Sequence, residues 1–386
     1  MTDLADIVVV GMGPGGEEVA SRLAEAGLDV VGVEANLVGG ECPYWGCVPS
    51  KMMIRAANLL TEAKRVNGLA GTASVSPDWA PVAKRIREEA TDNWDDRVAV
   101  ERFEKKGGHF VRGKGHLVGP HLVAVGDRIF EATKGIVLAT GAQAWAPPIH
   151  GLADTPYWSN REAVEVTDLP QSLAIIGGGA IAVELGQVFA RFGVAVSIVE
   201  VAPRLLPLEE PEAGALLKDV FRRDGIDVYT GVDLRAVAHD ASVFTLDLGP
   251  DKNLKAERLM VATGRRPDLK SLGIEALGID PKVKSLSTDD HLRVAPGVWA
   301  VGDVTGVGAF THVAMYQANI VVLDILGTVE TPVDYRALPR VTFTDPEIGS
   351  VGLTEEAARS RGISVRVGTA PIQASARGRI HGAGND

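Results

Sequence analysis

The sequence contains an internal repeat, and this repeat constrains the fold more than any other feature. Residues 5–34, ADIVVVGMGPGGEEVASRLAEAGLDVVGVE, align without a gap with residues 171–200, QSLAIIGGGAIAVELGQVFARFGVAVSIVE, 166 positions later. Each copy reads as a buried apolar strand, a glycine turn, an amphipathic helix and a second apolar strand that ends in a carboxylate. The repeat therefore predicts an α/β protein that contains two βαβ units.

The glycines of each turn have separate tasks in a Rossmann-like unit that binds a dinucleotide. One permits the tight turn, one lets backbone amides approach a pyrophosphate, and one lets helix and strand pack closely. Glu34 and Glu200 are spaced to accept hydrogen bonds from an adenosine ribose. A pair of βαβ units without ligands would leave both carboxylates unexplained. We therefore predict two dinucleotide sites, built at the turns by Gly11, Gly13, Pro14, Gly15 and Gly16, and by Gly177, Gly179, Ala180 and Ile181.

Two shorter segments also repeat, KGIVLATGAQ at 134–143 and ERLMVATGRRPD at 257–268. Each reads as a strand that runs into a glycine turn, and GVWAVGDVTG at 297–306 reads as a strand that stops at Asp303. Helical patterns cover 49–67 and a charged stretch at 79–106.

Composition limits the class of protein. The net charge is −11 and no run of Lys and Arg occurs, which argues against a protein that binds nucleic acid backbones. The N-terminus does not resemble a signal peptide, and no apolar run is long enough to cross a bilayer. We therefore expect a cytoplasmic protein, in which structural disulfides are rare.

Cys42 and Cys47, in GGECPYWGCVPSK at 39–51, are the only two cysteines of the 386-residue chain. A zinc site would need about four ligands, and no second pair exists. Two inert buried thiols are a second interpretation. A redox disulfide is favoured, because Cys47 precedes a helix start at Pro49 and lies near Lys51, and both features stabilise a thiolate.

The motif GGECPYWGCVPSK resembles the redox motif of the class I pyridine nucleotide-disulfide oxidoreductases, which include dihydrolipoamide dehydrogenase, glutathione reductase and mercuric reductase. The resemblance extends over nearly the whole chain, from the Gly11 turn to LPRVTFTDPEIGSVGLTE at 338–355. It implies two Rossmann-like domains, for FAD and NAD, and a partial α+β interface domain.

The resemblance also implies the domain boundaries. The FAD domain comprises 1–146 and 277–333, and its first part holds the redox disulfide. The NAD(P) domain comprises 147–276 and begins at a hinge, PPIHGL. The incomplete dimerisation domain comprises 334–386.

The same resemblance implies the roles of the site residues. Cys47 matches the cysteine that faces the flavin as a charge-transfer thiolate, and Cys42 matches the thiol that attacks the substrate. Lys51 matches a lysine near flavin N5 that pairs with Glu184. The residues that match other FAD contacts are Glu34, Gly40, Gly115, His116, Thr140, Gly141, Gly302, Asp303 and Thr311. Those that match contacts to the nicotinamide cofactor are Gly177, Gly179, Glu184, Glu200 and Gly264. No metal ligands are predicted.

The choice between NAD and NADP rests on two features that disagree. Ala182 stands where NAD enzymes of the family usually have glycine, which favours NADP. Glu200 would repel a 2′-phosphate, and Val201 and Pro207 stand where other members have phosphate-binding arginines. The second feature has the larger energy, so NAD is expected and NADP remains possible, with Arg204 as the residue that could reverse the choice.

The chain departs from the family at its C-terminus. Family members carry a His-Pro-Thr-x-x-Glu motif whose histidine serves as acid and base in the partner's active site, and none of the eight histidines here has that context. His381 reads as a surface residue. Either the chain is a piece of a longer protein, which the ending RIHGAGND favours, or a short protein works with an altered proton donor. A homodimer is expected, with weakened contacts if the C-terminus is absent.

Three functions are compatible with these residues. The first is FAD-dependent transfer of electrons between NAD(H) and a small disulfide or dithiol, as in dihydrolipoamide dehydrogenase. The second is mercuric reductase or NADH:quinone reductase activity. The third is a flavin-binding redox sensor without catalysis. Tyr44 and Trp45 lie between the cysteines in place of smaller residues, so the substrate stays open.

Overall fold

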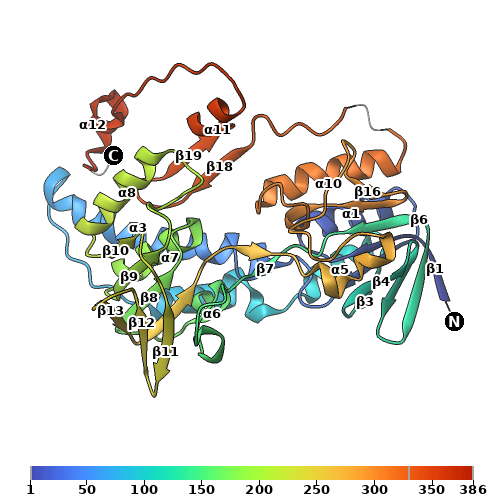
Figure 1. Ribbon diagram of the computed structural model, residues 1–386, viewed down its shortest axis with the longest axis horizontal. Helices are drawn as coiled ribbons and strands as arrows, with labels where there is room; N and C mark the ends of the chain where they lie inside the picture. Colours follow the sequence, from blue (N-terminus) through green and yellow to red (C-terminus); the bar gives the residue numbers. More distant parts are fainter. Residues whose placement is uncertain (1, 329–330, 385–386) are drawn as a thin grey trace. The chain divides into compact units, whose positions relative to one another are not determined.

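The computed structural model describes residues 2–328 and 331–384, which fold into two compact units. Unit 1 consists of Met1–Val48, Ala90–Gln143 and Arg265–Asp334, and unit 2 consists of Pro49–Glu89, Ala144–Gly264 and Tyr335–Asp386. The final two residues of RIHGAGND lie outside the described residues. Both units combine sheets with helices (Figure 1), so the predicted α/β class is confirmed.

Unit 1 is built on a sheet with the strand order β16-β17-β6-β1-β2-β3, to which the β4-β5 hairpin is added through β6. The neighbours from β17 to β3 are parallel. Its strands are β1 (Thr2–Val10), β2 (Val30–Glu34), β3 (His109–Arg112), β4 (Gly115–Gly119), β5 (Leu122–Val125), β6 (Arg128–Leu138), β16 (Arg293–Ala295) and β17 (Val298–Ala300). Its helices include α1 (Pro14–Glu25), α2 (Glu41–Tyr44), α5 (Arg97–Lys105), α9 (Leu269–Leu272) and α10 (Thr311–Ile325).

Alternate side chains of β1 enter two separate cores, as the pleat of a strand requires. Ile7 and Val9 pack with helices α1, α5 and α10 on one face of the sheet. Val8 and Val10 pack with β4, β5 and α9 on the other. Because both faces of the central strands are covered, the apolar run IVVV is continuous rather than alternating.

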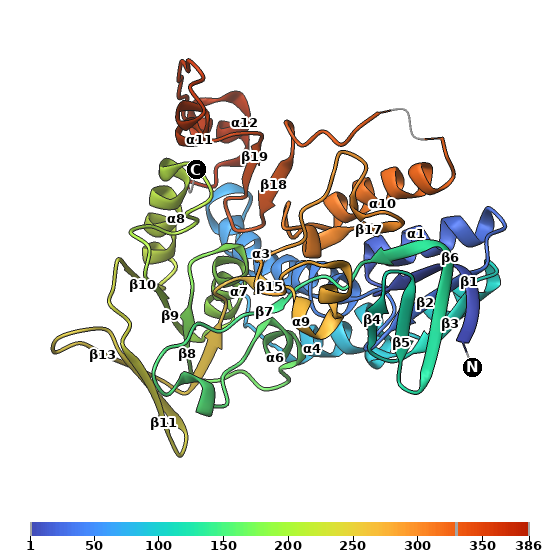
Figure 2. The same cartoon turned by 45° about the vertical axis from the view of Figure 1, so that its right-hand side comes forward.

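Unit 2 repeats this plan. Its parallel sheet has the order β10-β9-β8-β14, and an antiparallel sheet of β11-β12-β13 lies against one face (Figure 2). Helices α3, α7 and α8 cover the other face. The strands are β8 (Ser172–Ile176), β9 (Ala195–Glu200), β10 (Asp227–Thr230), β11 (Ala236–Asp240), β12 (Val243–Asp247), β13 (Asn253–Ala256) and β14 (Arg258–Val261). The helices include α3 (Cys47–Leu69), which begins in unit 1, and α4 (Ala80–Arg85), α6 (Asn160–Glu165), α7 (Ala180–Arg191) and α8 (Pro211–Arg223).

The C-terminal part of unit 2 begins with a β hairpin. Strands β18 (Pro339–Thr342) and β19 (Ile348–Val351) pair antiparallel, and α11 (Glu355–Ser360) and α12 (Ala376–His381) follow. Arg340 in β18 donates to the Glu209 carboxylate over 2.9 Å, and the Ser350 hydroxyl in β19 donates to it over 2.7 Å. Buried Glu209 therefore fastens the hairpin to the body of unit 2.

The two copies of the sequence repeat have the same structure. Ile7 is level with Val30 in the β1-β2 pair, and Leu173, at the equivalent position, is level with Val196 in the β8-β9 pair. In the first copy the N–H of Gly11 donates to the carbonyl of Val33, and Gly177 and Val199 repeat this bond, both at 2.8 Å. The gapless alignment thus corresponds to identical strand register.

One prediction of secondary structure was wrong. Residues 79–106 do not form a single helix, because Asp92, Asn93 and Trp94 have φ angles of 48°, 56° and 57°. After this left-handed turn, the buried Asp96 carboxylate accepts a hydrogen bond of 2.7 Å from the N–H of Val38. That distant contact holds α5 as a separate helix, and sequence periodicity does not report it.

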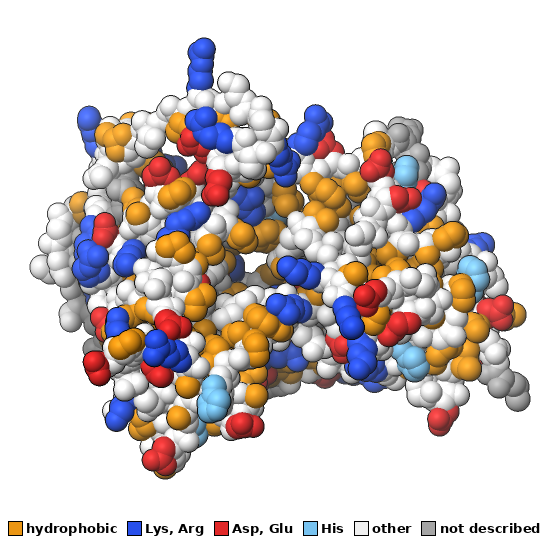
Figure 3. Space-filling model, viewed as in Figure 1, with side chains coloured by type: hydrophobic (Ala, Val, Ile, Leu, Met, Phe, Trp, Pro, Cys, Tyr) orange, Lys and Arg blue, Asp and Glu red, His pale blue; other side chains and the backbone are white. Residues whose placement is uncertain are grey.

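The surface carries side chains of mixed type. Figure 3 shows acidic, basic and apolar side chains interspersed over the visible face. Among residues 2–328 and 331–384, no helix is both long and apolar enough to span a bilayer.

Candidate active site

The glycine turns that precede α1 and α7 are shaped for close backbone approach. Gly11 and Gly177 have φ angles of 95° and 114°, and a Cβ on either would lie 2.4 Å from the carbonyl oxygen of Ala139 or Ala262. Only glycine fits both the angle and the space.

The second glycine of each turn differs from the first. Gly13 and Gly179 precede the first residues of α1 and α7, and a Cβ on either would meet nothing within 4 Å. The helix N-termini therefore face open space next to unpaired backbone N–H groups, which is the setting that a pyrophosphate needs. The residues of both turns fit a bound dinucleotide.

The two predicted ribose carboxylates are held in the same way in both units. Glu34 accepts from the N–H groups of Met12 and Asn36 over 2.8 Å each. Glu200 accepts from Gly178 over 2.6 Å and from Ala202 over 2.7 Å. Each carboxylate is thus fixed at its glycine turn as an anion with backbone donors, and lone pairs remain for ribose hydroxyls.

Five of the unit 1 residues predicted to contact FAD lie at the carboxyl ends of neighbouring parallel strands. Thr140 and Gly141 come after β6, Gly302 and Asp303 after β17, and Glu34 ends β2. This edge of an open α/β sheet is where ligands bind. Gly40 lies close to the β1 turn, because a Cβ on it would lie 2.8 Å from the Cα of Gly13.

The other predicted turn and strand residues are placed as follows. Pro14, Gly15 and Gly16 form the first turn of α1, and Gly15 lies against Ala314 of α10. Gly115 and His116 begin β4, and Ala180 and Ile181 begin α7. Gly264 has a φ of 109°, and its carbonyl accepts from the N–H of Trp145 in unit 2 over 3.0 Å.

The two cysteines lie near the N-termini of two successive helices in unit 1. Cys42 is in α2, and Cys47 is the first residue of α3. Both are free thiols, so the structure describes the reduced pair. Cys42 is partly buried and hydrogen bonds to Cys47, and this bond followed by burial raises the pKa of the Cys42 thiol well above its usual range. The Cys42 thiol therefore holds its proton more tightly than an ordinary cysteine does.

Thr311 adds a second contact to the exposed Cys47. Its hydroxyl oxygen lies 3.3 Å from the Cys47 sulfur, and Thr311 is the first residue of α10. A hydroxyl and the N-terminus of α3 both favour the anionic form of this sulfur. Thr311 was predicted as an FAD contact, and its contact with Cys47 was not foreseen.

Lys51 and Glu184 form an ion pair in unit 2. The Lys51 ammonium donates to one carboxylate oxygen of Glu184 over 2.9 Å, and the Phe343 N–H donates to the other over 2.8 Å. The Glu184 side chain is 8% exposed and that of Lys51 is 37% exposed. The Phe343 ring lies 4.4 Å from the Lys51 nitrogen.

The sequence analysis did not identify three residues that lie beside Glu184 or beside the Asp303 carboxylate. Phe343 and Gln187 touch or flank Glu184, and Arg265 lies between the carboxylates of Asp303 and Glu41, at 3.7 Å and 3.6 Å. Burial raises the pKa of Asp303, and Arg265 opposes that rise. Phe343 and Arg265 do lie within quoted motifs, but their contacts depend on chain segments far away.

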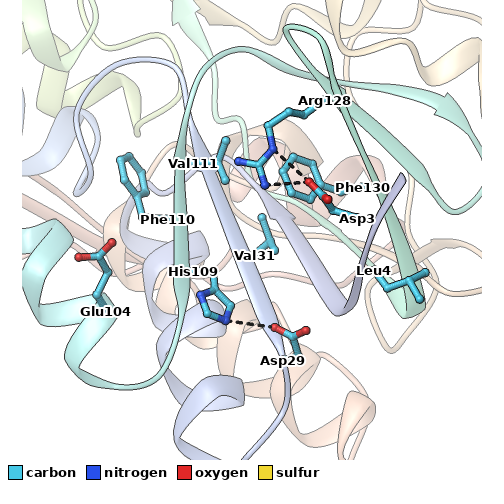
Figure 4. A pocket seen from close by; sticks show the side chains of 10 residues that line it. All are labelled: Asp3, Leu4, Asp29, Val31, Glu104, His109, Phe110, Val111, Arg128 and Phe130. Atoms are coloured by element: carbon cyan, nitrogen blue, oxygen red, sulfur yellow. Dashed lines mark hydrogen bonds and ion pairs between the residues drawn. The ribbon is translucent and has the colours of Figure 1, made fainter. Parts of the chain in front are cut away.

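A cavity of about 380 Å³ lies elsewhere in unit 1, near the amino ends of β1, β2 and β3. Arg128 points to Asp3 and His109 points to Asp29 at its wall (Figure 4). It contains none of the predicted site residues. Within the described parts of the chain, no cluster of three or more His, Cys, Asp or Glu side chains could hold a metal ion.

Comparison with known proteins agrees with this geometry. The sequence profile described as pyridine nucleotide-disulphide oxidoreductase matches residues 5–318, and the dimerisation domain of the same family matches residues 338–386. The chain is 34% identical to dihydrolipoyl dehydrogenase of Chlorobaculum tepidum, with 98% of this chain and 82% of the relative aligned. It is 30% identical to mercuric reductase of Staphylococcus aureus, over 97% and 70%.

A solved structure is similar over the whole chain. The copper(II) complex of the HOCl-induced flavoprotein disulfide reductase RclA from Escherichia coli superposes with a TM-score of 0.86, at 28% identity, over 99% of this chain and 85% of that one. The chain belongs to the pyridine nucleotide-disulphide oxidoreductase family. It is an FAD-dependent enzyme of the class that uses NAD(P)H and a redox-active cysteine pair.

Proposed function

We propose that the enzyme transfers electrons between NAD(H) and a small disulfide or dithiol of the dihydrolipoamide type. The observation that carries this proposal is the hydrogen-bonded pair Cys42 and Cys47 at the start of α3, with the Thr311 hydroxyl beside Cys47. FAD, when bound, supplies the two-electron step between the nicotinamide and this pair.

The cysteines divide the thiol chemistry between them. The Cys42 sulfur attacks a substrate disulfide after it loses its proton, and the hydrogen-bonded Cys47 lies in reach to take that proton. A mixed disulfide forms and one substrate thiol leaves. Cys47 then attacks the Cys42 sulfur, which closes the Cys42-Cys47 disulfide and releases the second thiol. With FAD bound, NADH and one proton would restore the dithiol, so that one disulfide, NADH and one proton give two thiols and NAD⁺.

The remaining predicted site residues would bind the cofactors. The proposal includes an FAD domain of residues 1–146 and 277–333 and an NAD(P) domain of residues 147–276. Glu34 and the Gly11 turn would hold the adenosine and pyrophosphate of FAD, and Glu200 and the Gly177 turn those of the nicotinamide cofactor. Lys51, held by Glu184, would lie near the flavin. A homodimer formed through residues 334–386 and a location in the cytoplasm complete the proposal.

The preference for NAD over NADP has a further argument. Arg204, the cation that could bind a 2′-phosphate, donates to the carbonyl oxygens of Leu206, Glu209 and Pro207 at 2.7–3.0 Å. Its guanidinium is used to hold its own loop. Glu200, with both oxygens fixed by backbone donors, would repel the phosphate.

Anaerobic mixing with NADH tests the proposal on the FAD-loaded protein. We expect loss of flavin absorbance and a long-wavelength band that is absent in Cys47→Ser, with NADPH at least about tenfold slower. A turnover panel of lipoamide, glutathione disulfide, Hg(II) and a quinone then identifies the acceptor. Mercuric reductase activity is the second candidate, because similar relatives carry that name. A flavin that neither NADH nor NADPH reduces would leave only the redox-sensor interpretation.

A further inference from the structure

A polar seam connects helices α3 and α7 in unit 2. On α3, polar residues recur every seven positions, which places them on one side of the helix, and on α7 three polar residues follow one another at spacings of three and four positions. The α3 residues are Lys51, Asn58 and Arg65, and the α7 residues are Glu184, Gln187 and Arg191. Lys51 pairs with Glu184, and Arg191 donates to Asn58 over 2.6 Å.

Residues 343–345, which follow β18, are hydrogen bonded to this seam. The Phe343 N–H donates to Glu184, and one turn further along α7 the Gln187 amide pairs with both backbone groups of Asp345, at 2.8 Å and 3.0 Å. Side chains of α7 therefore bind the backbone of residues 343 and 345 as a neighbouring strand would.

The Asp345 side chain anchors the far end of the segment. Its carboxylate accepts from Arg65 over 3.1 Å and from Arg191 over 2.8 Å. The Arg191 side chain is only 7% exposed. Two guanidinium groups in a partly buried setting hold the carboxylate, so the position of residues 343–345 is set relative to both helices.

The segment touches both members of the Lys51-Glu184 pair. The Phe343 N–H occupies the Glu184 oxygen that Lys51 does not use, and the Phe343 ring lies 4.4 Å from the Lys51 ammonium. An ammonium over an aromatic face is attracted to the ring, and the attraction is larger where water is partly excluded. Lys51 is thus held between a carboxylate and a ring.

We propose that Phe343 is a positioning residue for Lys51 in the flavin-reduction step, and that Asp345 and Gln187 hold Phe343 in place. The proposal rests on the role of Lys51 given under the proposed function. Phe343 directly follows β18 and belongs to the part of the chain that matches the dimerisation domain. The proposal therefore gives that part a direct contact with Lys51, which is expected near the flavin.

Replacing the ring tests this proposal in the FAD-loaded protein. We expect Phe343→Leu to lower the limiting rate of flavin reduction by NADH about twofold to fivefold, because the cation-π contact is lost. The apparent dissociation constant of NADH should stay constant, since the ring touches Lys51 rather than the nucleotide turn. Phe343→Tyr keeps the ring and should return the rate to within about twofold of wild type.

Two further measurements separate positioning from a general loss of structure. In a Lys51→Met background, Phe343→Leu should have no additional effect, because the ring acts through the ammonium. Acetylation of Lys51, measured by peptide mass spectrometry with or without FAD, should be about twofold to fivefold faster in Phe343→Leu and unchanged in Phe343→Tyr. Val341→Ala, at an exposed position of β18 two residues before Phe343, is the matched control and should match wild type in both assays.

The outcomes are distinct. A wild-type limiting rate in Phe343→Leu, or an equal further loss in the Lys51→Met background, would overturn the proposal while leaving the proposed function intact. If NADH does not reduce the wild-type flavin, the proposed function fails instead, and the acetylation rates still report whether Phe343 holds Lys51.

Discussion

Among single residues, Arg265 joins three segments of unit 1. Its guanidinium donates to the carbonyl of Ala142, and it lies within ion-pair distance of Glu41, beside the redox cysteine, and of Asp303, after β17. Burial raises the pKa of the Asp303 carboxyl, Arg265 lowers it again, and Glu41 adds to the rise. Arg265 therefore compensates two carboxylates that would otherwise repel each other.

Replacement of Arg265 should make stability depend more steeply on pH. In Arg265→Met the pKa of the Asp303 carboxyl rises further. At pH values above the ordinary carboxyl pKa, the ionised carboxylate then lowers the stability of the folded protein, and this loss disappears at acidic pH, where the carboxylate is protonated. We expect a loss of about 1–3 kcal/mol at pH 8 and a smaller loss at pH 5, measured by thermal unfolding. The neighbouring exposed Arg266→Met is the control. Equal losses at both pH values would exclude this explanation.

At the level of elements, the repeated βαβ unit provides a matched pair of glycines. Gly177 has a left-handed φ and lies against Ala262, whereas Gly179 has an ordinary φ of −81° and open space in front of α7. The first glycine serves the fold, and the second serves the space where a pyrophosphate would bind.

Alanine at these two positions should separate folding from binding. We expect Gly177→Ala to lower the free energy of unfolding by about 2 kcal/mol or more, because the Cβ clashes and the φ is strained. Gly179→Ala should keep the wild-type Tm and raise KM for NADH by about tenfold or more, because the methyl group occupies the binding space. Thermal unfolding and steady-state kinetics measure the two effects. A Gly179→Ala enzyme with the wild-type KM would show that the cofactor binds elsewhere.

The hairpin β18-β19 depends on one buried carboxylate. Burial raises the pKa of Glu209, but hydrogen bonds from Arg340 and Ser350 outweigh burial and hold the pKa below its ordinary value. Its contribution to stability is therefore present above the carboxyl pKa of the unfolded chain and is lost as pH falls.

Substitution of Glu209 should release the hairpin. We expect Glu209→Gln to lower stability by about 1–2 kcal/mol at pH 7 and to increase proteolytic cleavage near the hairpin. The difference from wild type should stay constant down to the ordinary carboxyl pKa of 4.5 and should shrink below it, as first the unfolded chain and then the folded carboxylate takes up a proton. Exposed Glu212→Gln is the control, and a difference that stays constant with pH would contradict the charge-based explanation.

For the whole molecule, the property considered is the association of two chains into a homodimer. The part that matches the dimerisation domain exposes several large apolar side chains, which include Val351 at 63%, Val367 at 60% and Ile380 at 77%. Several exposed apolar side chains within one part of a chain are consistent with a protein interface.

Charge introduced at these positions should weaken association. We expect wild type to sediment as a dimer and Val351→Lys with Ile380→Glu to shift it toward monomer, because a charge is costly in an apolar interface. Sedimentation velocity measures this. Leu4→Glu, equally exposed but in unit 1, is the control and should remain dimeric. A wild-type protein that is monomeric at micromolar concentration would contradict the homodimer.

Local pattern was sufficient for the repeated parts of the fold. The turns, the helices that follow them and the carboxylates at Glu34 and Glu200 were predicted because each depends on residues close together in the chain. Periodicity failed at 79–106, where the tertiary hydrogen bond from Val38 to Asp96 accompanies a break in the helix. It could also not show that Arg204 binds carbonyl groups of its own loop.

By itself, the sequence determined the two nucleotide-binding units, their register and the position of the cysteine pair, since short-range spacing dictates strand, turn and helix. The family resemblance implied the pair of Lys51 with Glu184, 133 residues apart. Only the tertiary structure decided the contact of Glu184 with Phe343, 159 residues away, and the position of Arg265 between carboxylates from two other segments. Such contacts form when packed elements bring distant side chains together, so no local spacing encodes them.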